Sequence, residues 1–150
     1  MYDNLTRSRP VPAVSPQAVT ASGTGIIIDF ADKHARTFDL QAGTLAACDG
    51  SNYLIFKLTV GDDSGLSDGV DAPADDLLTQ VKGAKPNIAS VAGGNIPLNA
   101  QALADQVFGR ICYRGQKRYG RIDWTETGTF NGLIAAQCHT SELPNNPSAL

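Results

Sequence analysis

The chain has 150 residues, of which 42% are hydrophobic and 18% charged, and its formal net charge is -3. This length suits one globular domain with a core large enough to fold without disulfides. The negative balance argues against a general nucleic-acid binder, because phosphate contacts need a broad basic surface. No apolar run approaches the roughly 20 residues that span a bilayer, and Met1–Thr20 lacks the apolar centre of a signal peptide, so we expect a soluble protein made in a cytoplasm.

Glycine, proline and cysteine usage indicates the fold class. The 15 glycines and 8 prolines, against 5 phenylalanines and 1 tryptophan, favour many turns and short elements over long helices. Cys48, Cys112 and Cys138 are an odd number of cysteines without CxxC spacing, so we expect buried free thiols rather than a disulfide framework. These features predict an all-β chain.

The amino-terminal segment is rich in proline. Pro10, Pro12 and Pro16 interrupt a stretch that has no periodic apolar face. Because proline cannot donate to a ladder or continue a helix, we expect residues 1–17 to form an extended arm outside the core. The alternatives are a disordered tail and an arm that becomes ordered against a partner.

Three segments that follow have strand character. GIIIDF, around Ile26, is β-branched, and RTFDL, residues 36–40, alternates polar and apolar side chains. In NYLIFKLTV, residues 52–60, alternate positions form one apolar face that belongs in the core. We expect residues 41–51, between the last two segments, to be a Gly-rich connection.

Residues 61–76, GDDSGLSDGVDAPADD, carry six aspartates. Such a loop suggests calcium binding, but the EF-hand pattern fails in register whether it starts at Asp62 or Asp63. We therefore favour a solvated acidic loop over a metal site.

The second half of the chain continues the pattern of short strands. Residues 77–81 suit a helical turn or an edge strand, and residues 99–108 suit either a short helix or a strand that begins near Gln106, which we favour. FNGLIAAQC, residues 130–138, predicts the last strand, and residues 143–150 a loose tail. We expect an antiparallel β-sandwich or jelly roll of six to eight strands, formed by residues 18–142 as a single domain.

Residues 108–127, FGRICYRGQKRYGRIDWTET, predict a β-hairpin. Alternation places Ile111 with Tyr113 on one face of the first arm, and Ile122 with Trp124 on one face of the second. Gly115 is expected to supply the positive φ of a short turn. Together with the last strand, this hairpin would form three neighbouring antiparallel strands. Its turn end would be cationic, since it gathers four basic residues, Arg114, Lys117, Arg118 and Arg121.

The sequence offers little that suggests catalysis. His34 and His139 are the two histidines, and a Cys112–His139–Asp arrangement can be assembled only on paper, because no nucleophile motif accompanies it. Cys138 and His139 are neighbours on a strand, so their side chains diverge and cannot easily share a metal. We expect no catalytic residue, no metal and no cofactor. A sugar-stacking platform of Trp124 with Tyr113 and Tyr119 is the alternative, and we favour a core role for Trp124.

The stretch 113–125, YRGQKRYGRIDWT, resembles a motif of small structural proteins of tailed phages, namely capsid decoration (cement) and related head proteins. The residues that carry the resemblance are Tyr113, Gly115, Lys117, Arg118, Tyr119 and Arg121, followed by LIAAQCHTSELP at 133–144 and preceded by YLIFKLTVGDDSG at 53–65. Two positions depart from the pattern: Gly120 stands where a β-branched residue is usual, and Cys112 replaces a glycine.

This resemblance implies a non-enzymatic protein that binds the outside of a capsid shell and stabilises it. The implied partner is the major capsid protein, with self-association into a dimer or trimer, and without direct nucleic-acid or membrane binding. The protein would lie on the capsid exterior of the virion after synthesis in the host cytoplasm. The residues expected to meet the partner are Arg7, Arg9, Pro10, Pro12, Arg114, Lys117 and Arg118. The alternatives are a carbohydrate-binding or adhesion module and a tail or connector component.

Overall fold

A computed structural model describes residues 8–31, 33–82, 87–88 and 94–142, and these residues form two antiparallel sheets. The first, here called the β4 sheet, has the order β1-β12-β4-β10-β7-β8. Its strands are β1 (Ser8–Val19), β4 (Lys33–Ala47), β7 (Leu77–Val81), β8 (Asn87–Ile88), β10 (Gln106–Tyr113) and β12 (Asn131–Glu142).

The second sheet, here called the β5 sheet, has the order β2-β11-β5-β6, with β3 also paired to β11 and β9 to β5. Its strands are β2 (Gly23–Thr24), β3 (Ile28–Asp29), β5 (Tyr53–Gly61), β6 (Val70–Asp71), β9 (Ile96–Leu98) and β11 (Tyr119–Thr127). Two single turns of 3-10 helix, Ala74–Asp76 and Gln101–Leu103, precede β7 and β10.

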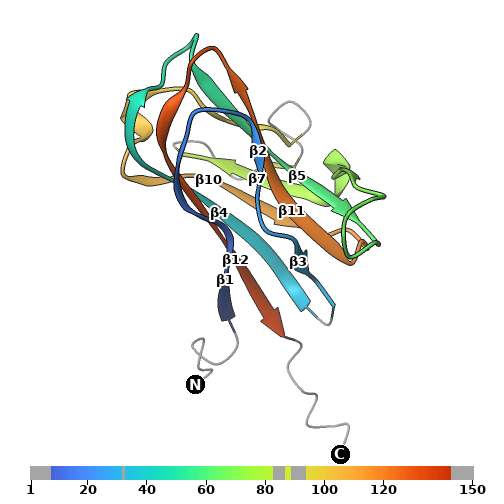
Figure 1. Cartoon of the computed structure of the whole chain (residues 1–150). Coiled ribbons are helices and arrows are strands. Elements are labelled where there is room, and N and C mark those ends of the chain that lie inside the picture. Colours follow the sequence, from blue (N-terminus) through green and yellow to red (C-terminus); the bar gives the residue numbers. More distant parts are fainter. Residues whose placement is uncertain (1–7, 32, 83–86, 89–93, 143–150) are drawn as a thin grey trace, which may run out of the picture.

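The strand order is that of a jelly roll. The sheet β1-β12-β4-β10 faces β2/β3-β11-β5-β6, and the chain passes repeatedly from one sheet to the other (Figure 1). The predicted all-β antiparallel fold is therefore confirmed. The two-residue strand β3 lies within the predicted GIIIDF strand, whereas the two-residue strands β2 and β6 were not predicted, because so short a segment shows no alternation.

The core lies between the sheets, and aromatic rings from both sheets pack against one another in it. Alternate residues of β5, among them Leu54, Phe56 and Leu58, are buried as predicted. Phe56 packs against Phe108 of the opposite sheet, with ring centroids 5.4 Å apart. The predicted inward faces of β10 and β11 are also correct, since Ile111, Tyr113, Ile122 and Trp124 are all buried.

The amino-terminal strand corrects one prediction. Ser8–Val19 pairs with β12 along its length, and Ala13 and Val14 are buried in the core, so this part of the expected arm belongs to the sandwich (Figure 1). β1 is an edge strand, where a missing N–H can face away from the ladder. The prolines therefore mark a sheet edge rather than a segment outside the core.

The predicted hairpin is wrong. β10 pairs with β4 and β7, whereas β11 pairs with β2, β3 and β5, so residues 114–118 cross from one sheet to the other. β12 is likewise no neighbour of β11, since it lies between β1 and β4. Gly115 is not among the glycines with positive φ, which in the described chain are Gly94 and Gly128. A side chain at Gly115 would instead collide with the Tyr113 hydroxyl.

The expected Gly-rich connection is wrong for residues 41–47, and residues 77–81 take the strand form of their two expected forms. β4 continues to Ala47, through residues expected to form a Gly-rich connection, and residues 77–81 form a strand. β10 begins at Gln106 as predicted.

Candidate partner interface

The described residues expected to meet a partner lie in two segments, both at the same end of the sandwich. Pro10 and Pro12 are exposed near the start of β1, while Arg114, Lys117 and Arg118 belong to the connection 114–118, here called the link. Cross-strand register aligns Pro10 with His139, His139 with Thr37, and Thr37 with Cys112. The start of β1 and the end of β10 are thus three strand spacings apart, roughly 14 Å. Arg7 and the side chain of Arg9 lie outside the described part.

Two cations of the link are paired with carboxylates. Lys117 Nζ lies 2.6 Å from Asp62 Oδ2, and the Arg118 guanidinium donates two hydrogen bonds, of 3.1 and 3.0 Å, to Asp29. The hydrogen bond from Arg118 lowers the pKa of Asp29, and the one from Lys117 lowers the pKa of Asp62. The cationic end that the sequence predicts is therefore largely neutralised.

Arg114 differs from these two residues. Its backbone N–H donates to the Asp76 carbonyl at 2.8 Å, but its exposed guanidinium has no side-chain partner within the described residues. Within the described chain, Arg114 is consequently a positive charge of the link that no carboxylate neutralises.

The link is held in place by Arg36, which sequence reasoning missed. Arg36 Nη1 donates to the Gly115 carbonyl at 2.6 Å, and its guanidinium carbon lies 5.2 Å from the Phe30 ring centroid and 5.7 Å from that of Tyr113. A signal was present, because Arg36 shares its alternating face with Phe38, which points inward.

Tyr113 fixes the link from inside. Its phenol oxygen accepts a hydrogen bond of 3.1 Å from the Lys117 N–H, and burial raises the pKa of the phenol. The chain therefore turns around a buried ring rather than through a glycine with positive φ.

A cleft of about 230 Å³ opens between the link and the region of β6. The exposed Val70 and Pro73 give it apolar walls above the buried Val60, while Asp76, Arg114 and Lys117 are the charged residues that line it. This is a concave surface beside residues already expected to meet a partner.

The acidic loop is organised by its own carboxylates. Asp68 accepts hydrogen bonds from the N–H groups of Asp62 (2.8 Å) and Asp63 (3.1 Å), and Asp63 accepts from Gly65 (2.9 Å) and Ser67 (3.1 Å). These backbone donors lower the pKa of both Asp63 and Asp68. The described residues contain no cluster of three or more potential metal-ligating side chains.

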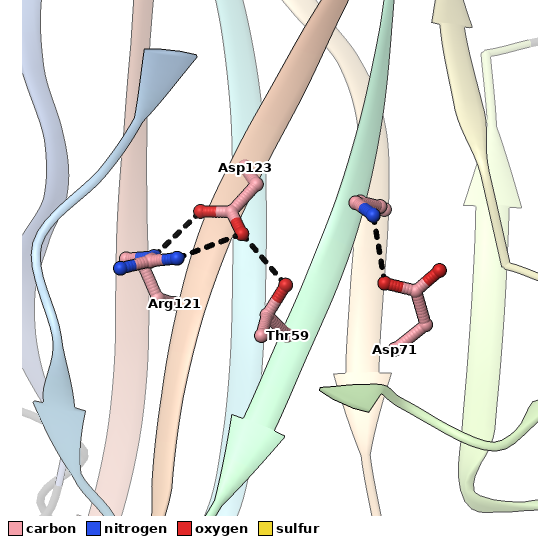
Figure 2. Close-up of polar contacts among 5 residues, drawn as sticks. Thr59, Asp71, Arg121 and Asp123 are labelled. Carbon is pink, nitrogen blue, oxygen red and sulfur yellow. Dashed lines mark hydrogen bonds and ion pairs between the residues drawn. The ribbon is translucent and has the colours of Figure 1, made fainter. Parts of the chain in front are cut away.

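Each sheet carries a shielded carboxylate on its outer face. On the β5 sheet, Asp123 accepts from Arg121 Nε at 2.6 Å and from the Thr59 hydroxyl at 2.7 Å (Figure 2). On the β4 sheet, Asp39 pairs with Arg110, and His139 Nε2 lies 3.2 Å from its Oδ2. Both carboxylate side chains are 12% exposed.

The thiols are not arranged as nucleophiles. Burial raises the pKa of Cys138 to about 12, and the buried Cys48 donates to the Leu98 carbonyl. Thr37 separates His139 from Cys112 in the cross-strand register, so these two residues are about 10 Å apart and form no catalytic pair. The side chain of His34 lies outside the described part.

The proposed sugar-stacking platform does not form. Trp124 and Tyr113 are both buried, and Trp124 Nε1 donates to the Ala21 carbonyl at 3.0 Å. Stacking on a sugar requires exposed ring faces, so Trp124 is a core residue, as the sequence favoured.

No helix in the described part of the chain is long and apolar enough to cross a membrane. The chain matches no family model and no curated protein. Its structure is similar to the crystal structure of the SPBc2 prophage-derived protein YomS, with a TM-score of 0.53 and 9% sequence identity; the match covers 89% of this chain and 91% of that chain. At this identity the likeness concerns the fold alone.

Proposed function

We propose that the chain is a non-enzymatic structural protein of a phage particle, which binds the outside of the capsid shell and stabilises it. One observation carries this proposal: nearly the whole chain shares its fold with nearly the whole of a prophage-derived protein. The motif at residues 113–125, which resembles that of capsid decoration proteins, adds independent support from sequence.

The surface chemistry suits a passive building block. Cys138, with a pKa of about 12, is protonated at neutral pH and is a poor nucleophile. The β1 edge carries Pro10, Pro12 and Pro16, which discourage further strands from adding to the sheet. Association would then use faces and loop ends. The partner in this proposal is the major capsid protein, with self-association into a dimer or trimer on the virion exterior.

Co-sedimentation with shells that lack the chain tests the proposal. The purified protein should sediment with such shells, and particles with the protein should retain their genome to a higher temperature than particles without it. Absence of sedimentation, together with equal heat resistance of the two kinds of particle, would contradict shell binding. Labelling of the tail or connector instead of the head would assign the chain to the alternative component of the virion.

The structure also sharpens a deletion experiment. Removal of Met1–Pro16, most of the expected arm, would also delete most of β1 with the buried Ala13 and Val14, so it cannot test shell binding with the fold intact. Removal of residues 1–7 tests the amino-terminal arm without this loss. Circular dichroism should then be unchanged, and the arm has no binding role if shell affinity is unchanged as well.

A further inference from the structure

The cleft beside the link contains a positive charge that the described chain leaves unpaired and an apolar surface that it leaves exposed. The Arg114 guanidinium has no side-chain partner there, whereas the described arginines Arg110, Arg118 and Arg121 each bind an aspartate. Val70 is 54% exposed, more than any other large hydrophobic side chain in the described residues. Both line the same cleft.

The cleft is preformed by contacts on its two sides. Lys117 is tied to Asp62 in the acidic loop, the Gly115 carbonyl accepts from Arg36, and the Arg114 N–H donates to Asp76. A surface held in this way loses little conformational freedom when a partner binds.

We propose that this cleft receives an extended segment of the major capsid protein in which an aliphatic side chain stands next to an aspartate or glutamate. The aliphatic side chain covers the exposed Val70 and Pro73, and the carboxylate pairs with Arg114. This inference rests on the proposed function and adds to it the chemistry of the contact.

Volume and charge favour this occupant over others. A space of about 230 Å³ is smaller than the roughly 300–1,000 Å³ of pockets for drug-sized ligands, so it suits one or two side chains. Asp76 is the carboxylate in the lining, and its Oδ2 lies against the backbone of the link, 2.6 Å from the position that a Cβ at Gly115 would take. Of the cations in the lining, Lys117 is already neutralised by Asp62, which leaves Arg114 for an incoming carboxylate.

The test compares two charge reversals in the full chain, Arg114→Glu and Lys82→Glu. Lys82 is a matched control, because it is also exposed and without a side-chain partner among the described residues. It follows β7 of the β4 sheet and does not line the cleft. Affinity for shells that lack the chain is measured by co-sedimentation, and thermal unfolding confirms that both variants fold. We expect Arg114→Glu to weaken binding about tenfold or more, and Lys82→Glu to leave it unchanged.

The outcomes separate the two proposals. Equal affinities of the two variants, whether high or low, overturn the cleft as the contact while wild-type sedimentation keeps shell binding intact. Failure of the wild-type protein to sediment overturns both. A second substitution, Val70→Glu, removes the apolar wall at an exposed position and should weaken binding like Arg114→Glu, and normal binding by this variant contradicts the predicted aliphatic contact.

Discussion

The outer faces of the two sheets hold similar carboxylates in different ways. Asp39 on β4 is bound by Arg110 from β10 and approached by His139 from β12, so three adjacent strands meet at it. Asp123 on β11 is bound by Arg121 of the same strand and by Thr59 of the neighbouring β5 (Figure 2). The carboxylates are equally shielded, but their partners are not.

From this difference we expect the exposure of the partners to decide what each carboxylate contributes to stability. The side chains of Arg110 and His139 are 50% and 37% exposed, whereas that of Arg121 is 22% exposed and Thr59 is buried. If the carboxylate is removed, the exposed partners can bind water instead, while the buried Thr59 and the less exposed Arg121 lose the acceptor that they have among the described residues.

The largest effect is therefore expected from Asp123→Ala. It should lower the free energy of unfolding by about 2–3 kcal/mol, because the Thr59 hydroxyl and the Arg121 guanidinium are left without an acceptor. Urea denaturation measures the loss. Asp123→Asn is the control, since its amide oxygen still accepts from Thr59 and should preserve part of the stability. A loss below about 0.5 kcal/mol for Asp123→Ala would contradict this account.

Asp39→Ala should be milder. We expect a loss of about 1–2 kcal/mol in the same denaturation experiment, because Arg110 and His139 can be hydrated where they stand. A loss as large as that of Asp123→Ala would show that the clamp across three strands matters more than partner exposure.

The exposed pair Lys57–Asp71 calibrates the comparison. Its atoms are 2.8 Å apart, yet the two side chains are 35% and 65% exposed. A double-mutant cycle with Lys57→Ala and Asp71→Ala should give a coupling energy below about 0.5 kcal/mol. A larger value would mean that exposure is a poor guide on this face.

The smallest single-residue effect concerns the acidic loop. The pKa of Asp68 is lowered by backbone hydrogen bonds, so the unfolded chain binds its proton at a higher pH than the folded chain does. The contribution of this group is thus present above the ordinary pKa of 3.8 and is lost as the pH falls through the lowered value. Thermal unfolding from about pH 5 downward should lose stability less steeply in Asp68→Asn than in the wild type, and identical slopes would contradict the assignment.

The sequence predicted faces better than it predicted neighbours. Alternation in β5, β10 and β11 correctly identified the buried side chains, because burial repeats every second residue whichever sheet a strand joins. The same alternation cannot distinguish a hairpin from a crossing between facing sheets, so the link at 114–118 was misread. The burial of Tyr113 beneath the link was the feature that local turn chemistry did not reveal.

Tertiary context also explains particular residues of the motif. Gly120 stands where a β-branched residue is usual because the ring of Phe30 occupies the space that a side chain would need. The candidate interface was predicted as a group of cations together with Pro10 and Pro12. The ion pairs of the cations with Asp29 of β3 and Asp62 of the acidic loop, both distant in sequence, depend on a topology that spacing along the chain does not encode.

Imaging of the intact phage particle at residue resolution tests the central proposal most directly. The account predicts density for this jelly roll on the outer surface of the shell, in contact with the major capsid protein. Density inside the shell or on the tail, or a particle that lacks the chain, would contradict it.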